Sequence, residues 1–581
     1  MTTFIIVIGF LIYFTLYFTY GKKLERDVVM ASDAKETPSQ RLYDGVDYIP
    51  ARTPVLFGHH FASIAGAAPI IGPALAICWG WVPGLLWVWF GNIFIGAVHD
   101  YLALMASVRY DGKSVQFVAS DLMGKRTGTA FYWIVFFLLV LVVAAFGAII
   151  GRMFVATPAI ASAFIWMIVA ALILGVLMYR VKMNFNAATL IGIVMLIAAI
   201  IIGVEMPITA TYQTWMIFLF FYIIIAASIP VNVLLQPRDY LNSFLLYAGL
   251  LVGFIAAVFA FRGFEIPAFS TFSPVLLGGK PTPFWPAIPL VIACGSLSGF
   301  HSLVASGTTS KQLDKESSGL SIGYGAMFTE GFLSTIVIVS IAGFGYTAIL
   351  NAGVTTEALN PGNWGAAFTK ISASVKLSAA NLFTQSYADM VNSTWLSIIP
   401  TQYVKVLAGM WVAAFAMTTL DTTNRLGRYC LSEMAAPLKE STPAVYTALT
   451  NRWIASVIPA AIGIYLAWSG NWLIIWGSFG AANQLIASIA LMTGAIWVFA
   501  KMRSQFHAVA VIPAVLLWIT VTAAIIWFLA VVMPGDIAKK AVPGWTVSVI
   551  LVIMLIMNFI FITDFWKSYK KVGQSGSGAQ Q

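Results

Sequence analysis

The sequence contains little charge and few cysteines. Only 9% of its 581 residues are charged while 60% are hydrophobic, and the mean hydropathy is +0.88. Soluble globular proteins carry about 25% charged residues, so this composition excludes that class and indicates a membrane protein with many spans. The three cysteines, Cys78, Cys294 and Cys430, lie far apart in apolar stretches. This pattern excludes a disulfide framework and predicts small core residues.

The sequence also lacks a Walker A motif and any long soluble segment, which argues against an ATP-driven pump. The net charge of +10 comes from Lys and Arg residues that cluster between apolar runs, as topology signals do, so no nucleic-acid partner is expected. The five histidines are spread over separate stretches without ligand spacing. Neither a metal nor an organic cofactor is therefore expected.

About fifteen apolar stretches of membrane-spanning length follow one another along the chain. They lie at 4–20, 55–78, 84–108, 129–150, 161–179, 186–204, 214–236, 241–262, 286–306, 321–348, 401–424, 453–468, 472–500, 510–532 and 545–564. If the loops alternate sides, most Lys and Arg residues fall on one side, which predicts an external N-terminus and a cytoplasmic C-terminus. The first stretch lacks a basic start and a cleavage site, and it is predicted to be a retained helix.

The second apolar stretch contains residues that break helices. GHHFASIAGAAPIIGPALAI, from Gly58 to Ile77, holds three glycines and two prolines. Interrupted helices in transporters form substrate sites at mid-membrane, and an unwound segment at Ser63–Pro73 would turn backbone amides toward an anion such as a carboxylate. Substrate contacts are therefore expected at Ser63, Gly66, Ala67 and Ala68. The alternative is that these small residues only allow close helix packing.

A similar interruption, SIPVNVLLQPRDYLN, occurs five stretches later at Ser228–Asn242, and it adds Asn232 and Gln236 as expected substrate contacts. Because the two stretches would run in opposite directions, their spacing predicts an inverted repeat of two five-helix units. The expected organisation is an N-terminal helix and loop (1–53), a first repeat (54–210), a second repeat with an external segment at 351–400 (211–436), accessory helices (437–572) and a disordered tail (573–581).

Five sequence blocks follow one another along the chain: ARTPVLFGHHFASIAGAAPIIGP, HDYLALMASVRYDGKS, QPRDYLN, GFHSLVASGTTSKQL and TLDTTNRLGRY. They resemble the carbon starvation protein family of bacterial peptide and pyruvate transporters. The resemblance implies an all-α plasma-membrane fold similar to that of the amino acid, polyamine and organocation transporters, with an inverted core and flanking helices. It also implies starvation-induced import of small peptides, or alternatively of pyruvate, driven by a proton or sodium gradient. The expected partners are the substrate, membrane lipid and a small accessory protein.

Ionisable residues within apolar stretches are expensive to bury and are functional candidates. At about 1.5 Å of rise per residue, six of them fall roughly 7 to 15 Å from the inner end of their stretches, in one layer. We expect a network that takes up a proton during transport, formed by His59, His60, His99, Asp100, His301 and Glu330. The alternative is a set of structural pairs that hold helices together.

Two charged pairs are expected at the inner gate. Arg238 and Asp239 are adjacent, and Asp421 and Arg425 share a helix face at i,i+4 spacing. Arginine side chains that reach from the apolar region to the membrane surface are the simpler explanation.

Polar residues in two other apolar stretches are the remaining candidate functional residues. Ser306, Thr308 and Thr309 offer hydroxyl oxygens that suit a sodium ion, or they cap a helix end. Asn483 and Gln484 lie in an apolar run and are expected to hydrogen-bond between helices. No nucleophile–base constellation indicates an enzyme, so the competing class is a channel or a membrane sensor of a metabolite.

Overall fold

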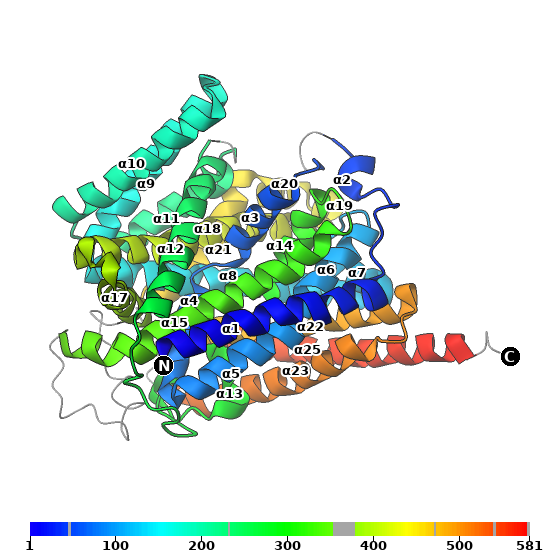
Figure 1. The fold of residues 1–581 in the computed structure, drawn as a ribbon. Coiled ribbons are helices and arrows are strands. Elements are labelled where there is room, and N and C mark those ends of the chain that lie inside the picture. The colour runs from blue at the N-terminus through cyan, green and yellow to red at the C-terminus, as the bar shows by residue number, and fades with distance from the viewer. Residues whose placement is uncertain (45–47, 231–232, 352–377, 470–471, 539–541, 578–581) are drawn as a thin grey trace.

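The computed structural model describes residues 1–44, 48–230, 233–351, 378–469, 472–538 and 542–577 (Figure 1). Within these ranges the regular elements are helices, and no β-strand is formed. Eleven helical segments are long and apolar enough to cross a membrane. They are Thr2–Val29, Trp81–Arg109, Lys125–Ala156, Pro158–Arg180, Phe185–Glu205, Pro237–Phe259, Leu320–Leu350, Thr401–Met434, Trp472–Met502, Ala508–Gly535 and Gly544–Gln574. The expected all-α membrane fold is therefore confirmed.

Each of the fifteen predicted stretches contains at least one helix, but four of them do not form a long continuous span. Two are short helices, α11 (Tyr212–Ser228) and α21 (Arg452–Ala467). The other two are interrupted, the first as α3 (Thr53–Ile64) and α4 (Ala68–Ala76), the second as α13 (Phe284–Val291) and α14 (Gly299–Gly307). The predicted count of fifteen is therefore not confirmed.

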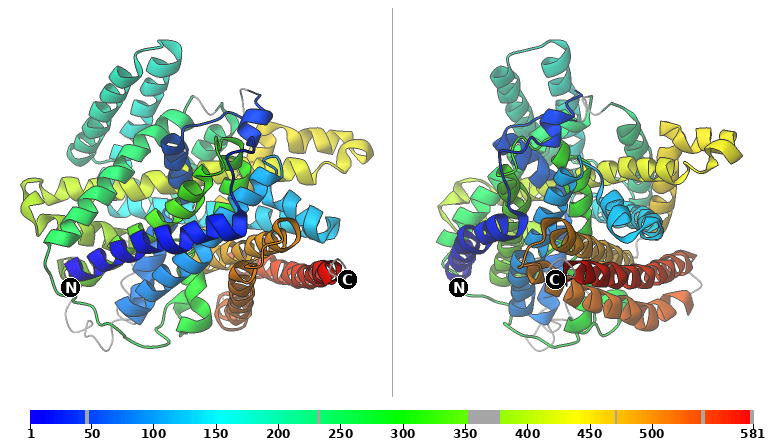
Figure 2. Two further views of the ribbon diagram at one scale, coloured as in Figure 1. Left: turned by 45° about the vertical axis from the view of Figure 1, so that its right-hand side comes forward. Right: turned by 90° about the vertical axis from the view of Figure 1, so that its right-hand side faces the viewer.

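The remaining elements define the packing of the bundle. They include α1 (Thr2–Leu16), α5 (Trp81–Gly91), α6 (Ala97–Arg109), α8 (Lys125–Ala156), α9 (Pro158–Gly175), α10 (Phe185–Glu205), α12 (Leu235–Phe259), α15 (Gly325–Asn351), α17 (Ala379–Asn392), α18 (Thr401–Met434), α22 (Trp472–Trp497), α23 (Ala508–Trp527) and α25 (Val542–Ser577). Of the apolar window of α8, 94% is buried against other helices, compared with 33% for α10. An apolar helix buried on all sides is central, so α8 lies in the core, whereas α9 and α10 extend away from the bundle (Figure 2).

The break between α3 and α4 is shorter than the predicted unwound segment. It comprises Ala65–Ala67, and the two helices meet at a bend of 51°. Ser63 is still helical, and Pro73 lies inside α4. Pro69 stands in the first turn of α4, where a missing N–H removes no helical hydrogen bond.

The second interruption differs from the expected one. The Ser228–Asn242 stretch is the connection between α11, which ends at Ser228, and α12, which begins at Leu235. Pro230 follows the end of α11, and Pro237 is tolerated in the first turn of α12. The interrupted helix that contacts α4 is instead α13–α14, whose residues 292–298 are not helical.

Segments outside the bundle also differ in part from expectation. The helix α25 extends into the predicted tail as far as Ser577. The 351–400 segment, which is expected to be external, contains α17, which packs on α15 and α18, while its residues 352–377 lie outside the described residues. The N-terminal loop runs along the 312–318 connection, where Ala51 N–H donates to Gln312 O at 2.9 Å and Ser39 Oγ to Leu313 O at 2.7 Å.

Candidate substrate and ion site

The non-helical backbone between α13 and α14 is held by side-chain amides from two neighbouring helices. Asn92 donates to Gly295 O and Met327 O, both at 2.7 Å. Asn483 on α22 accepts from Phe300 N at 3.0 Å, and Gln484 donates to Leu297 O at 2.9 Å. An unpaired backbone group at membrane depth costs several kcal/mol, so these amides allow the break to exist. Asn483 and Gln484 do bond between helices, but their partners are freed backbone groups.

His60 on α3 connects two further elements around this break. Its Nε2 lies 3.0 Å from Asp100 Oδ2 on α6, and its Nδ1 lies 2.8 Å from Thr309 Oγ1, just after α14. All three side chains are fully buried, and Asp100 Oδ1 has no hydrogen-bond partner among the described residues. With His60 neutral and Asp100 ionised, this site would carry one negative charge, and a single added proton would cancel it.

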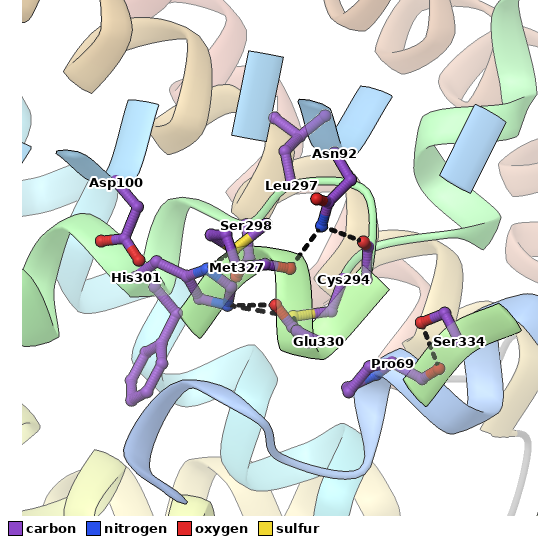
Figure 3. Close-up of polar contacts among 12 residues, drawn as sticks. Pro69, Asn92, Asp100, Cys294, Leu297, Ser298, His301, Met327, Glu330 and Ser334 are labelled. Carbon is purple, nitrogen blue, oxygen red and sulfur yellow. Dashed lines mark hydrogen bonds and ion pairs between the residues drawn. The ribbon is translucent and has the colours of Figure 1, made fainter. Parts of the chain in front are cut away.

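A second cluster lies beside the break and includes Cys294 from within it (Figure 3). Cys294 Sγ lies 3.2 Å from His301 Nε2 and donates to Glu330 Oε1 at 2.9 Å. Glu330 Oε2 is 3.5 Å from His301 Nε2, and His301 Nδ1 lies 2.9 Å from Met327 Sδ. These residues come from the break, α14 and α15, and all are buried.

The six residues predicted to form one proton network therefore do not form a single hydrogen-bonded group. His60 pairs with Asp100, and His301 pairs with Glu330. His99 is buried, but neither ring nitrogen has a hydrogen-bond partner among the described residues, and His59 is exposed. The expected single layer is better described as two neighbouring pairs.

The predicted substrate contacts of the first break lie between α8 and α18. Gly66 faces Thr419 on α18 and Phe146 on α8, at such short range that a methyl group at position 66 would lie 2.6 Å from Thr419 Oγ1. Thr419 Oγ1 is buried without a hydrogen-bond partner among the described residues, and the first turn of α4 has no side-chain cap. Ala67 and Ala68 are buried beside it.

Other predicted substrate contacts are placed differently. The Ser63 hydroxyl donates to His59 O at 2.8 Å, within its own helix. Asn232 lies outside the described residues, and Gln236 belongs to the first turn of α12.

Of the two expected charged pairs, Arg238–Asp239 is formed, whereas Asp421–Arg425 is not. Asp421 does not pair with Arg425 but with Arg238, which also bonds Asp239 at 2.8 Å. Arg425 instead donates to Ala226 O at 2.9 Å and Ile229 O at 3.0 Å, at the C-terminal end of α11. Carbonyl groups at a helix C-terminus attract a cation, which explains why Arg425 turns away from its own helix.

The three hydroxyls proposed for sodium have different hydrogen-bond partners. Ser306 donates to Ser302 O at 2.6 Å, and Thr308 is exposed and donates to Val304 O at 3.1 Å. Only Thr309 reaches another site residue, His60.

Sequence reasoning missed three residues of these clusters. Cys294 was predicted to be a packing residue, yet its thiol contacts His301 and Glu330. Asn92 and Thr418 were not singled out, although Thr418 Oγ1 accepts from Arg238 at 3.2 Å. A polar side chain inside an apolar run was the available signal for all three.

Comparisons with known proteins extend over nearly the whole chain. The family model described as "Carbon starvation protein CstA" matches residues 1–524. The chain is 32% identical to the "Peptide transporter CstA" of Bacillus subtilis, over 97% of this chain and 96% of that protein. It is 31% identical to the protein of the same name in Escherichia coli (89% and 80% covered) and 29% identical to the E. coli "Pyruvate/proton symporter BtsT" (90% and 81% covered).

Among solved structures, a manganese transporter of Eremococcus coleocola aligns over 87% of this chain and 95% of its own, at 11% identity and a TM-score of 0.31. A likeness of this size carries no argument about the fold. The match of the family model and the identity to the Bacillus protein do decide the family. The chain belongs to the carbon starvation protein CstA family.

Proposed function

We propose that this protein is a secondary active transporter of the plasma membrane that imports small peptides by alternating access, with protons as the coupling ion. The observation that carries the proposal is the buried His60–Asp100 pair, which joins the interrupted helix α3–α4 to α6 and the end of α14. The printed names of the relatives, peptide transporters and one pyruvate/proton symporter, support the same class of function.

The substrate carboxylate binds at the break between α3 and α4. The uncapped first turn of α4 supplies partial positive charge, and the buried hydroxyl of Thr419 is a donor without a protein partner among the described residues. Gly66, Ala67 and Ala68 let the substrate approach the backbone. A peptide and pyruvate both present a carboxylate, so pyruvate is the second candidate substrate.

Protonation of the His60–Asp100 pair couples the proton gradient to transport. Adding a proton removes the net charge of a site that is shielded from water, and this change alters the attraction between α3 and α6. The hydroxyls of Ser306 and Thr308 both donate to carbonyl groups of α14, and this engagement within the helix favours a proton over sodium.

The core consists of two inverted five-helix repeats that begin at the two interrupted helices. The first runs from α3 to α10 and the second from α13 to α22, with α11 and α12 between them. This arrangement shifts the second repeat from the boundary at residue 211 expected from the sequence. The contacts of α4 with α13 and of α8 with α18 support it. The N-terminus is external, the C-terminus is cytoplasmic, and membrane lipid and a small accessory protein complete the partners.

Uptake into proteoliposomes tests the proposal. Purified protein is given a labelled dipeptide or labelled pyruvate, and an inward proton gradient or an inward sodium gradient is imposed in separate experiments. Accumulation of dipeptide above its external concentration, in the proton gradient alone, is the expected result. Accumulation of pyruvate alone would favour the second substrate. Equilibration without accumulation in either gradient would indicate a channel, and binding without uptake would indicate a sensor.

A further inference from the structure

We propose that Cys294, His301 and Glu330 form a site for a divalent metal ion of the zinc type, which ties the break between α13 and α14 to α15. The ligand atoms of these three residues lie within 4.8 Å of one another, and all three side chains are buried. The proposal does not depend on the transported substrate or on the coupling ion.

The distances within the cluster suit a common central ion. Zinc bonds of about 2.0–2.3 Å place neighbouring ligands of a tetrahedron about 3.3–3.8 Å apart. The observed separations are 3.2 Å between Cys294 Sγ and His301 Nε2, 2.9 Å between Cys294 Sγ and Glu330 Oε1, and 3.5 Å between His301 Nε2 and Glu330 Oε2. Outward movements of a few tenths of an ångström would admit the ion. Glu330 presents one oxygen to each of the other two ligands, so it offers a fourth donor atom.

Three atoms of the cluster, one from each residue, can be offered to a cation. Met327 Sδ accepts hydrogen bonds only, so His301 Nδ1, which lies 2.9 Å from it, carries the ring proton. His301 Nε2 is then an acceptor, and it faces the Cys294 sulfur, whose single proton is directed to Glu330 Oε1. Glu330 Oε2 has no hydrogen-bond partner among the described residues. One cation at the centre satisfies all three groups.

The charges and the donor atoms of the cluster favour a divalent cation of the zinc type. When they bind a metal, Cys294 and Glu330 are a thiolate and a carboxylate, so a divalent ion leaves the buried site neutral. Within the described part of the chain Glu330 Oε2 lies 3.5 Å from the neutral His301 ring, and no Lys or Arg is paired with it there. Sulfur and imidazole donors prefer zinc-type ions to sodium or magnesium. The contact between His301 Nδ1 and Met327 orients the ring, as outer contacts of metal-bound histidines do.

The metal site would stabilise the break between α13 and α14, which is otherwise held by side-chain amides. Asn92 and Gln484 bind the carbonyl groups of the break, and the ion would fix Cys294 within the break to His301 and Glu330 on the two helices beside it. This assigns His301 and Glu330 a structural role in place of the proton relay expected from the sequence.

Cobalt is the probe, because thiolate-bound Co²⁺ has a charge-transfer absorption that oxygen and nitrogen ligands do not produce. The full-length protein, carrying a tag without histidine, is synthesised in medium supplemented with Co²⁺ so that the buried site is filled during folding. It is then purified in detergent and dialysed. About one Co²⁺ per chain and the thiolate absorption are expected, with displacement of Co²⁺ by Zn²⁺.

Matched cysteine variants identify the ligand. Cys294→Ser should lose the thiolate absorption, and its bound Co²⁺ should fall by at least ~10-fold, with a smaller loss in Glu330→Gln. Cys78→Ser and Cys430→Ser should keep both, because these buried cysteines lie outside the cluster. Metal-free wild-type protein, or an absorption that survives Cys294→Ser, would overturn the proposal. If Cys294→Ser does not fold, X-ray absorption of the wild-type protein decides, since a first shell without sulfur would overturn it equally.

Discussion

Arg238 on α12 and Asp421 on α18 form a buried ion pair although they are 183 positions apart in the chain. The exposed fraction of both side chains is 0%, and the Arg238 guanidinium also donates to Tyr222 Oη at 2.8 Å. The pair therefore joins α11, α12 and α18 at one point. Removing one member of a buried ion pair leaves the other charge buried without a counter-charge, which lowers the stability of the fold.

Asp421→Asn is expected to lower the free energy of unfolding by about 3–5 kcal/mol. Asp239 stays beside Arg238 but is partly exposed, so it compensates only in part. Denaturant unfolding of the purified protein measures the loss. The control is Asp111→Asn, which removes the exposed pair with Arg41 and should cost about 0–1 kcal/mol. Equal losses in the two variants would contradict the importance of burial.

Asp100→Asn tests the proton site. The amide keeps the shape of the carboxyl group but cannot take up the coupling proton, so accumulation driven by a proton gradient should fall to the level of empty liposomes. Exchange of labelled for unlabelled substrate needs no net proton movement and should continue. Asp121→Asn, at the residue that accepts from Tyr110 Oη at 2.8 Å, is the control and should keep both activities. Loss of exchange as well as accumulation would assign Asp100 a purely structural role.

Gly66→Ala tests the close approach at the first break. The added methyl group would lie 2.6 Å from Thr419 Oγ1, so we expect a loss of stability of about 1–3 kcal/mol together with reduced uptake. Thr419→Ala in the same chain removes the contacting oxygen and should restore part of the stability, whereas uptake should stay low because Thr419 is a proposed donor to the substrate carboxylate. Gly307→Ala is the control, because a methyl group there meets no atom within 4 Å. If the second substitution restores nothing, the Thr419 contact is not the cause.

Asn483→Leu should destabilise the second break. The substitution removes the acceptor of Phe300 N and the donor to Ala293 O, and each buried group left unpaired costs about 1–3 kcal/mol. Thermal unfolding in detergent is the measurement. Asn392→Leu is the control, since Asn392 donates to Ala388 O within its own helix and is not buried. An unfolding temperature as high as that of the control would contradict the role of Asn483.

Much of the helical framework could be predicted from hydropathy, because a membrane helix needs a long apolar run whatever its neighbours are. The same reasoning placed His60, Asp100, His301 and Glu330 at similar depth. It could not choose their partners, since pairing depends on how helices pack. Thus Asp421 was matched with Arg425 by spacing along one helix, whereas the structure supplies Arg238 from another.

The two helix breaks show the same difference between features that local sequence predicts and features that depend on helix packing. Glycine and proline indicated the interruption between α3 and α4 correctly, because these residues disturb a helix locally. The break after α13 contains Gly295 at φ +84°, so a local signal was present, but its backbone is satisfied by distant amides such as Asn92 and Gln484, whose contacts depend on helix packing. The contacts of Cys294 depend on this backbone turn and were missed for the same reason.

The two breaks differ in how firmly their neighbours hold them. Side chains from outside the break bind the backbone between α13 and α14 at several points, whereas α4 begins without a side-chain cap. During a transport cycle we therefore expect unequal roles, with α13 and α14 as the stationary support and α3 as the moving arm that hinges at Gly66. Substrate would then be bound between a mobile helix, α3, and the fixed helices α13 and α14.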